Sequence, residues 1–573
     1  MTEQAHFKFG VEVARTIKHA LELDKKNGDS LWQEAIKTEL KQINDFKTFR
    51  TLERGESLRD FQRIPYHFVF DVKFDLRRKA RLVAGGHRTD PPKEDIYSGV
   101  VGIETVRLAF LLASMNGLQI CAADIGNAFL HGKTREKVYV IAGAEFDDLN
   151  GLPMIIDKGL YGLKSSSARF HEHLAAKLRR MGYLPSRADP DLWMKDMGTY
   201  YSYIATYIDD ILAIDRDPLK IINEIKKDYI LKGIGAPEYY LGGDVETLDE
   251  AWNKEGIATA LSARTYIANV SEKMEKMLGV TLKNYTTPMA FEYHPELDTT
   301  PLISAFDTTK FRAMVGSCNW LITLGRLDIN YAVQALSRYR TAPRQGHFEA
   351  MIRVLGYLKK FYKGRIIMDP NYRDNSDYEK KIKDYDNWKE FYPDAEEELP
   401  PNMPKPMGKA AQITCYVDAD HAHDQMTRRS VTGIILLVNN TPIKWMSKRQ
   451  KTIESSTYGS ELVAAHLATE MVMEIRYALR MLGIPVDGPA LMLGDNLSEV
   501  VNTTIPSSML RKKHNAIAYH RVREAIAANI LKFVHVDTKD NLADIMTKPL
   551  RSEQHYSLAK QMLFRQSKAY HGK

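Results

Sequence analysis

The stretch YIATYIDDILAI, residues 203–214, places two short apolar runs on either side of the adjacent carboxylates Asp209 and Asp210. Both runs are rich in strand-forming residues, so the pattern predicts a β-hairpin with the two aspartates at its tip. Aspartate is also common in turns for structural reasons alone. On this stretch by itself, a structural role and a functional role for the pair have roughly even odds.

A second carboxylate lies at the end of another apolar run. Asp124 follows residues 118–123, and the chain then bends at Gly126 and resumes with the apolar residues 128–130. Two strand-end aspartate sites separated by a helical segment suit a two-metal phosphoryl-transfer centre, because each Mg²⁺ prefers hard oxygen ligands in near-octahedral geometry. The sequence therefore predicts phosphoryl-transfer chemistry at this place.

The composition is that of a large globular protein. At 573 residues the length corresponds to roughly four domains, and 44% hydrophobic residues suffice for several cores. The formal charge of +7 is a small excess of 80 basic over 73 acidic residues, which permits a nucleic-acid partner without requiring one. Three separated cysteines without a Cys-x-x-Cys pair favour a reducing compartment and argue against structural zinc. No apolar run approaches the ~18 residues of a membrane span, so no membrane partner is expected.

The region before the hairpin supplies cations and glycines. Residues 11–47 have helical periodicity, and residues 67–72 and 79–83 are strand-like. Lys79 and Arg81 share one strand face, where they suit either a triphosphate clamp or a solvated surface. The glycine-bearing residues 158–165 precede a predicted helix at 168–181, an arrangement that lets a nucleotide or a base pair approach the backbone.

The region after the hairpin is mostly helical. Residues 221–230 are predicted as a helix, 232–235 as a turn and 239–245 as one strand. Residues 265–278 and 311–362 have helical patterns, and the second carries many cations among aromatics, which suits either a surface that tracks a duplex or a solvated helix face. Residues 370–411 are polar and contain prolines, as in a linker.

A second acidic constellation follows. The predicted order is β-β-β-α-β-α-β-α, the layout of a ribonuclease H-like fold, and its chemistry uses carboxylates that hold two Mg²⁺ roughly 3.5–4 Å apart. Each acid alone suits a turn or a cap, whereas four at these places in one domain indicate a site. They are Asp418, Glu461, Asp495 and Asp544.

Taken together, the pattern resembles the reverse transcriptase–ribonuclease H portion of the Pol polyprotein of copia-type LTR retrotransposons, from about Trp32 to Leu550. The motifs in this order are highly specific, although YxDD alone is only moderately so. The matching stretches are KARLVAGGH (79–87), ADIGNAFLHG (123–132), KGLYGLKSSSARF (158–170), YIDDIL (207–212), YYLGGDV (239–245), LDINYAVQALSRY (327–339), YVDADHA (416–422), RRSVTG (428–433), SSTYGSELVAA (455–465), GDN (494–496), KKHNAIAYHRVRE (512–524) and NLADIMTKPL (541–550).

The resemblance implies roles for individual residues of the polymerase. Asp124, Asp209 and Asp210 would be the catalytic, metal-holding carboxylates, with Asp210 contributing less directly. Phe129 would lie under the sugar of the incoming nucleotide and exclude a 2′-hydroxyl by its bulk. Three basic residues would also bind the nucleotide: Lys79 and Arg81 would lie near the triphosphate, and Lys232 would donate a proton to the leaving pyrophosphate.

The resemblance also implies a second site and a set of partners. Asp418, Glu461, Asp495 and Asp544 would hold the nuclease metals, with two Mg²⁺ in each active site and Mn²⁺ as a substitute. The expected partners are an RNA template, a DNA or tRNA primer, the RNA/DNA hybrid, dNTPs and the integrase of the same element. The expected location is a cytoplasmic virus-like particle, with the nucleus as the alternative. His514 and His520 match the motifs without an assigned role.

The fold implied is an α+β right-hand polymerase (fingers, palm, thumb/connection) followed by an α/β ribonuclease H-like domain. Its expected parts are an N-terminal helical segment (1–60), fingers and palm (61–250), thumb/connection helices (251–369), a linker (370–411), the ribonuclease H-like domain (412–551) and a basic C-terminal tail (552–573).

The chain departs from the family pattern at several positions. Ser165 replaces the common Gln, which shortens a side chain expected to face the nucleotide, and Gly459 stands where the first acid of an EAE motif is usual. These departures keep a second hypothesis open, a catalytically silent or domesticated element product that binds nucleic acid. A polymerase acting on DNA alone is disfavoured by the attached nuclease domain.

Overall fold

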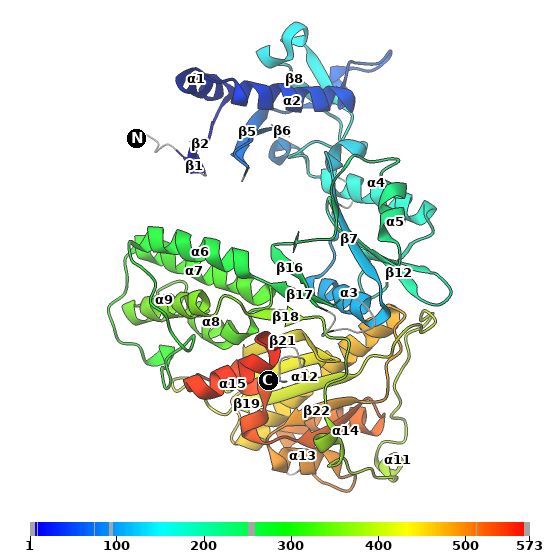
Figure 1. Ribbon diagram of the computed structural model, residues 1–573, viewed down its shortest axis with the longest axis vertical. Coiled ribbons are helices and arrows are strands. Elements are labelled where there is room, and N and C mark those ends of the chain that lie inside the picture. Colours follow the sequence, from blue (N-terminus) through cyan, green and yellow to red (C-terminus); the bar gives the residue numbers. More distant parts are fainter. Residues whose placement is uncertain are drawn as a thin grey trace.

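The computed structural model describes residues 6–566 apart from 9, 74, 91–95, 250, 251, 253–257, 511 and 512. Figure 1 shows an elongated molecule with four parts: an N-terminal lobe, a central sheet, a helical bundle beside it and a C-terminal domain at the other end. Within the described residues, no helix has both the length and the apolar character needed to traverse a lipid bilayer.

The N-terminal lobe packs two helices, α1 (Ile17–Asn27) and α2 (Leu31–Asp45), against a hairpin of β5 (Tyr66–Val72) and β6 (Arg78–Ala84). A small sheet of β3 (Phe49–Arg50), β9 (Pro153–Ile156), β8 (Val138–Ile141) and β4 (Gln62–Arg63) completes it, and β1 (Phe7–Lys8) pairs with β2 (Val11–Glu12). The predicted alternation on β6 is confirmed, because Ala80 and Leu82 are buried while Lys79 and Arg81 lie half-buried on the opposite face.

The central sheet has six strands, in the order β10 (Leu184–Pro185), β11 (Leu192–Asp196), β12 (Tyr201–Tyr207), β13 (Asp210–Asp215), β7 (Gln119–Ile125) and β14 (Leu231–Gly235). One face packs against α4 (Ser166–Arg180) and α5 (Pro218–Ile225), and the other against α3 (Ile103–Asn116). The predicted hairpin is confirmed as β12 and β13, which pair antiparallel.

Two local predictions after the hairpin are wrong. Residues 232–235 do not form a turn, because they belong to β14 and pair with β7 at the edge of the central sheet. Residues 239–245 form two strands, β15 (Tyr239–Tyr240) and β16 (Gly243–Thr247), rather than one. Leu241 and Gly242 between them adopt left-handed conformations, with φ of +45° and +89°, and turn the chain back on itself.

The helical bundle contains α6 (Arg264–Leu278), α7 (Ala305–Thr323), α8 (Asn330–Ser337) and α9 (Gln345–Lys360). It adjoins the sheet β15-β16-β17-β18, completed by β17 (Thr259–Ser262) and β18 (Arg365–Ile367). Some cations predicted for a duplex-tracking surface have structural partners instead. Arg326 is only 1% exposed and forms a buried ion pair with Asp328 at 2.6 Å, while Arg338 contacts Asp424 of the C-terminal domain at 2.8 Å.

The C-terminal domain is built on a five-stranded sheet with the order β21-β20-β19-β22-β23, in which β19 pairs antiparallel with β20 and parallel with β22. The predicted order β-β-β-α-β-α-β-α is confirmed as far as the last strand, with the short α13 added after β22. The final helix does not open at residues 541–544 as predicted, because Leu542–Met546 form a short 3-10 segment and the helix that follows begins at Ser552. The elements are β19 (Ile413–Asp420), β20 (Val431–Val438), β21 (Thr441–Arg449), α12 (Thr457–Met481), β22 (Ala490–Gly494), α13 (Leu497–Thr504), α14 (Ala516–Ala527) and β23 (Leu531–His535).

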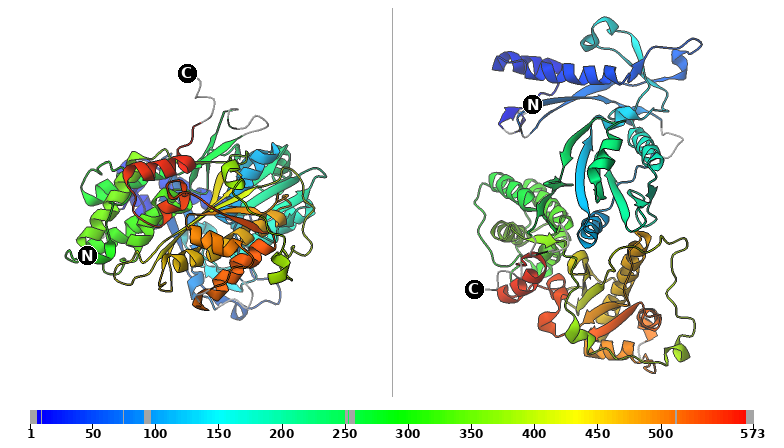
Figure 2. Two further views of the ribbon diagram at one scale, coloured as in Figure 1. Left: turned by 90° about the horizontal axis from the view of Figure 1, so that it is seen from below. Right: turned by 45° about the vertical axis from the view of Figure 1, so that its right-hand side comes forward.

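The central sheet and the C-terminal domain share one apolar core, and Figure 2 shows the two parts side by side. The buried guanidinium of Arg107 on α3 donates to the carbonyl of Ile443 on β21 at 2.9 Å and lies 4.2 Å from the ring centre of Trp445. On β12, the buried hydroxyl of Tyr203 donates to the carbonyl of Leu482 at 2.7 Å. The two parts are therefore fixed to each other by packing and by buried hydrogen bonds.

Residues 370–411 and 552–566 lie against the C-terminal domain. The predicted linker contains two short helices, α10 (Ser376–Glu379) and α11 (Trp388–Phe391), and runs along that domain (Figure 1). The segment assigned to a basic tail begins with α15 (Ser552–Leu563), whose apolar face is buried in the shared core. Within α15, His555 Nε2 lies 3.1 Å from the backbone oxygen of Asp328, so this helix also contacts the helical bundle.

An ion-pair cluster holds the linker in place and gives a testable prediction. The carboxylate of Glu397 accepts hydrogen bonds from Arg480 and, at 2.7 and 2.8 Å, from the buried Arg476. Burial raises the pKa of Glu397, but hydrogen bonds and charges from the two guanidinium groups outweigh it and lower the pKa to about 2. We expect Glu397→Gln to lower the free energy of unfolding by about 2 kcal/mol, because a buried cation loses its counter-charge.

The pH dependence of that loss follows from the direction of the shift. The folded-state pKa of Glu397 lies below its ordinary value of 4.5, so the cluster stabilises the fold above pH ~4.5 and this contribution disappears as the pH falls towards ~2. Denaturant unfolding of wild type and variant at pH 7 and pH 3 measures the difference. An equal destabilisation at both pH values would contradict this assignment.

Candidate active sites

The first candidate site lies at the tip of the β12–β13 hairpin. Asp210 is the cross-strand partner of Asp124 on β7, and Asp124 is in turn the partner of Lys232 on β14. Residues directly opposite each other on neighbouring strands have Cβ atoms roughly 4.5–5.5 Å apart and face the same side of the sheet. The register thus places two carboxylates and an ammonium group in one row, with Asp209 at the adjoining turn.

The turn is held in an unusual conformation. Ile208 has φ of +56°, in the left-handed region that β-branched residues avoid. The backbone N–H of Ile125 donates to the carbonyl of Asp209 at 2.8 Å and fastens the turn to β7. Strain of this kind costs on the order of 1–3 kcal/mol and is concentrated at functional sites. It therefore supports a functional explanation of the aspartate pair over an ordinary turn.

Each carboxylate at the tip disfavours the ionised form of its neighbours. Burial raises the pKa of Asp210 to about 6, with further contributions from the charges of Asp209 and Asp124. Burial likewise raises the pKa of Asp209, and the charge of Asp124 adds to the effect, while Arg81 and Lys79 oppose it. Such a cluster of acids has a net negative potential and favours a bound cation.

Cations and aromatics of the N-terminal lobe face this tip. The guanidinium of Arg81 lies 4.6 Å from the ring centre of Tyr161, and the Tyr161 ring meets Phe129 edge to face at 5.1 Å. Burial lowers the pKa of Lys79, and the positive charges of Arg81 and Lys232 contribute. Of the four predicted nucleotide-binding residues, Lys79 and Arg81 act electrostatically on Asp209, Lys232 acts on Lys79, and Phe129 is linked to Arg81 through the Tyr161 ring.

The glycine-bearing loop at 158–165 has a different explanation from the predicted one. Gly162 has φ of +92°, and an added Cβ would lie 2.1 Å from the carbonyl oxygen of Ala84. The glycine thus allows the backbone of β6 to approach closely. Ser165 is 5% exposed, and both its backbone N–H and its hydroxyl donate to Oε1 of Glu136, at 2.9 and 2.5 Å. The Ser165 side chain therefore makes a structural contact with Glu136.

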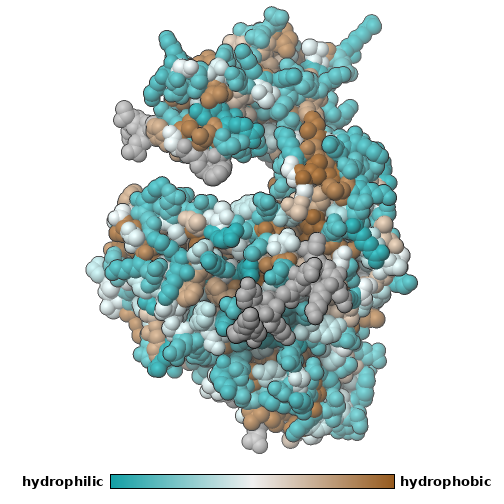
Figure 3. Space-filling view, in the orientation of Figure 1, coloured by the Kyte–Doolittle hydropathy of each residue, from teal (hydrophilic) through white to brown (hydrophobic). Residues whose placement is uncertain are grey.

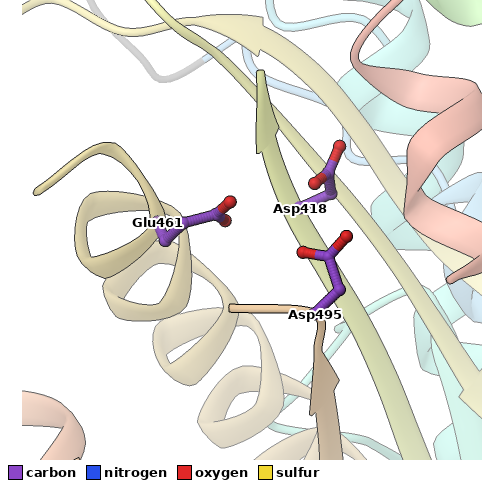
Figure 4. Close-up of side chains that lie close together, drawn as sticks. All are labelled: Asp418, Glu461 and Asp495. Carbon is purple, nitrogen blue, oxygen red and sulfur yellow. The ribbon is translucent and has the colours of Figure 1, made fainter. Parts of the chain in front are cut away.

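The second candidate site lies in the C-terminal domain. Carboxylate oxygens of Asp418, Glu461 and Asp495 all lie within 4.8 Å of one another, the one such acidic group among the described residues. Figure 4 shows Glu461 reaching from α12 towards Asp418 and Asp495, which come from the ends of neighbouring strands. The aspartates at the hairpin tip do not form so tight a group.

Asp544 lies beside this group and has a lysine partner. Lys548 Nζ is 2.9 Å from Asp544 Oδ1 and 3.7 Å from Asp418 Oδ2, and the Thr547 hydroxyl donates to Asp418. Burial raises the pKa of Asp544 to about 8, and the charge of Asp418 adds to the effect. Burial lowers the pKa of Lys548, but the charges of Asp418 and Asp544 outweigh it and raise the pKa overall.

Some residues at these sites were missed by the sequence reasoning. Lys548 belongs to the quoted NLADIMTKPL stretch and Tyr161 to the quoted KGLYGLK stretch, but neither had been given a role. Glu499 on α13 is buried near the group of Asp418, Glu461 and Asp495. An acid in the first turn of a helix is commonplace because it suits the helix dipole, so nothing in the pattern distinguished it.

The two histidines without an assigned role have structural contacts. His514 Nε2 lies 3.3 Å from Oε2 of the buried Glu454, and His520 Nδ1 lies 2.8 Å from the Tyr392 hydroxyl on the linker. Neither is part of the acidic groups described above.

Both acidic groups have the donor chemistry of a divalent-cation site. Carboxylate oxygens are the hard ligands that Mg²⁺ and Mn²⁺ prefer. In the C-terminal domain three of them already converge within 4.8 Å. The space-filling view shows an open hollow between the N-terminal lobe and the helical bundle (Figure 3), so a long polymer has room to enter between these two parts.

Comparison with known proteins agrees with the geometry. Residues 47–290 match the family described as "Reverse transcriptase (RNA-dependent DNA polymerase)". The Pol polyprotein from transposon RE1 of Arabidopsis thaliana is 29% identical over 84% of this chain, and that of transposon TNT 1-94 of Nicotiana tabacum is 24% identical over 90%. The chain spans 30% and 36% of the length of these two relatives.

Among solved structures, the N-terminal RNase H domain of rv2228c from Mycobacterium tuberculosis, solved as a fusion with maltose binding protein, matches 26% of this chain and 98% of that chain, with a TM-score of 0.19 and 9% identity. Residues 47–290 are thus similar to reverse transcriptases, and most of the chain is similar to part of the Pol polyproteins of copia-type retrotransposons.

Proposed function

We propose that this chain is an RNA-directed DNA polymerase that copies retrotransposon RNA into DNA and degrades the RNA of the resulting hybrid at a second site. The observation that carries the proposal is the row of Asp210, Asp124 and Lys232 on three adjacent strands, with Asp209 at the turn. In this proposal the N-terminal lobe acts as fingers, the central sheet as palm and the helical bundle as thumb. The hollow between them would hold the template and primer (Figure 3).

The polymerase step joins a primer to a nucleotide. The 3′-hydroxyl gives up its proton to water and its oxygen attacks the α-phosphorus of a dNTP; the new P–O bond forms as the bond from the α-phosphorus to the bridging oxygen breaks, and pyrophosphate leaves. Two Mg²⁺ held by Asp124, Asp209 and Asp210 would supply charge neutralisation for the attacking and leaving oxygens. Lys79 and Arg81 would bind the triphosphate oxygens through charge-assisted hydrogen bonds.

Lys232 is the group placed to serve the leaving pyrophosphate. It stands directly across from Asp124 on the edge strand β14, and its ammonium group can give a proton to the departing oxygen. The register between β7 and β14 thus supports a role that the motif alone suggested only weakly.

The nuclease step hydrolyses a phosphodiester of the RNA strand. Water attacks the phosphorus, and the 3′-oxygen of the preceding nucleotide leaves with a proton. Asp418, Glu461 and Asp495 would hold the metal ions that activate the water and neutralise the leaving oxygen. Thr547 and Lys548 orient Asp418 and Asp544 through the contacts described above.

The proposal is tested by two assays on the same full-length protein. With Mg²⁺ and dNTPs, we expect extension of a labelled DNA primer on an RNA template and shortening of the labelled RNA within a preformed hybrid. Absence of both activities with Mg²⁺ and with Mn²⁺ would favour the alternative, a silent element product that only binds nucleic acid. The integrase of the same element and a virus-like particle remain proposals for its partner and its location.

Sugar selection gives a separate prediction at Phe129. This ring is half-buried and is held edge to face by Tyr161 at 5.1 Å. We expect Phe129→Ala to raise the incorporation of ribonucleotides relative to deoxynucleotides by about 10- to 100-fold, because the space for a 2′-hydroxyl opens. Steady-state extension with a dNTP and the matching rNTP measures the ratio. Phe129→Tyr keeps the bulk and is the control; equal selectivity in the two variants would contradict the role.

A further inference from the structure

Glu499 occupies a fixed position next to the nuclease carboxylates. It lies in the first turn of α13, four residues after Asp495, which follows directly on β22. The side chain of Asn496 caps this helix and accepts the backbone N–H of Glu499 at 3.1 Å. The strand end that carries Asp495 and the backbone of Glu499 are therefore joined by one short capped turn.

The carboxyl group of Glu499 is buried without a complete set of partners. The residue is 1% exposed, and its Oε1 has no hydrogen-bond donor among the residues described. Buried carboxyl oxygens almost always have a partner, since their desolvation is otherwise uncompensated. An oxygen in this condition beside three converging carboxylates indicates a missing partner with positive charge.

The charges around Glu499 point the same way. Burial raises the pKa of Glu499, and the charges that act on it come from Asp495 and Asp418. The charge of Glu499 in turn raises the pKa of Glu461. Lys548 partly neutralises the negative charges of Asp418 and Asp544, and its positive charge also lowers the pKa of Glu461. Within the described part of the chain, no cation contributes to the pKa of Glu499.

We propose that Glu499 is a further carboxylate of the nuclease metal centre, which holds a divalent cation together with Asp495 on the side of the group away from Lys548. This inference builds on the proposed nuclease function. In this proposal, the carboxylates on the two sides of the nuclease metal centre have different positive partners. Lys548 is a counter-charge for Asp544 and Asp418, and the metal ions that Asp418, Glu461 and Asp495 would hold are also the counter-charge for Glu499.

The test measures metal binding directly. Two full-length proteins are compared. The first carries Asp209→Asn, so that the hairpin tip contributes less to Mn²⁺ binding, and the second carries Asp209→Asn together with Glu499→Gln. Calorimetric titration with Mn²⁺ alone is expected to show an affinity at least about tenfold weaker in the Glu499→Gln protein, the scale for loss of a group that supports a metal. The rise in melting temperature caused by Mn²⁺ should shrink in parallel. Glu553→Gln, an exposed glutamate on α15, is the matched control.

Each outcome decides the inference. Unchanged Mn²⁺ affinity and unchanged Mn²⁺-dependent stabilisation in Glu499→Gln would overturn it, because a buried acid with a purely structural role leaves both intact. If the glutamine protein does not fold, Glu499→Asp keeps the charge but withdraws it by one methylene, and a wild-type Mn²⁺ affinity there would overturn the inference equally.

The same measurements separate this inference from the proposed function. Wild-type protein that cleaves a hybrid but binds Mn²⁺ independently of Glu499 would refute the inference alone. Wild-type protein that binds Mn²⁺ through Glu499 yet cleaves no hybrid would support the inference and refute the nuclease function.

Discussion

Asp209→Asn is expected to reduce primer extension by at least about 10³-fold, the scale on which removal of one preorganised electrostatic group slows a reaction. The substitution keeps the size of the side chain and removes the charge from the turn that Ile125 fastens to β7. The charge of Asp124 then lacks its partner for holding two cations. Single-turnover extension with saturating dNTP measures the chemical step. Cleavage of a preformed hybrid should stay within about twofold of wild type, because the nuclease group uses other carboxylates.

The control for this variant lies in the same sheet. Asp196 is exposed at the end of β11, opposite Tyr201 and thus at the far end of the sheet from the hairpin tip. Asp196→Asn should extend primers at the wild-type rate. Loss of hybrid cleavage in Asp209→Asn, or unchanged extension, would contradict two separate active sites.

The hairpin and the strand-end carboxylates could be predicted because their signals are local. Alternating apolar residues define β6, and short β-prone runs define β12 and β13. Asp124 was expected near Asp209 and Asp210 because a two-metal phosphoryl-transfer centre needs carboxylates from two such strand-end sites. The register in which Asp124 pairs with Asp210 confirms that placement. In the C-terminal domain, acids at the ends of β19 and β22 likewise converge with Glu461.

The remaining features depend on tertiary pairing that no local pattern encodes. Lys232 lies in a glycine-bearing segment typical of a turn, and only pairing with β7 makes it a strand. The glycines of residues 158–165 were predicted to let a nucleotide or a base pair approach the backbone, and nothing in the pattern showed that one of them, Gly162, lies against the backbone of β6. Glu499 became visible only because folding buries it beside Asp495 and Asp418.

The junction between the central sheet and the C-terminal domain was also absent from the sequence prediction. Tyr203 is part of the hairpin that carries Asp209, and its hydroxyl bonds to the backbone just after α12, the helix that carries Glu461. The two candidate sites thus belong to elements that contact each other directly. A shared core of this kind resists independent domain motion, so the distance between the sites is set by the fold and not by the length of residues 370–411.

Glu461→Gln is expected to give the opposite pattern to Asp209→Asn. Burial raises the pKa of Glu461 well above its ordinary value, and the charges of Asp418, Glu499 and Asp495 add to the effect. A cation bound among these carboxylates would favour the charged form of Glu461, whereas the neutral amide of glutamine cannot become charged. Hydrolysis of the RNA in a labelled hybrid should fall by at least about 10³-fold, measured with enzyme in excess.

Primer extension by Glu461→Gln should remain within about twofold of wild type, because the fold around the hairpin is untouched. An amide of the same shape should not destabilise the metal-free protein, since it replaces a carboxyl group that lies among other acids. Glu470→Gln on the same helix, where Glu470 is exposed and pairs with Arg521 at 2.6 Å, is the matched control and should retain both activities. Parallel loss of extension and hydrolysis in Glu461→Gln would mean that the shared core, and not the metal group, had been damaged.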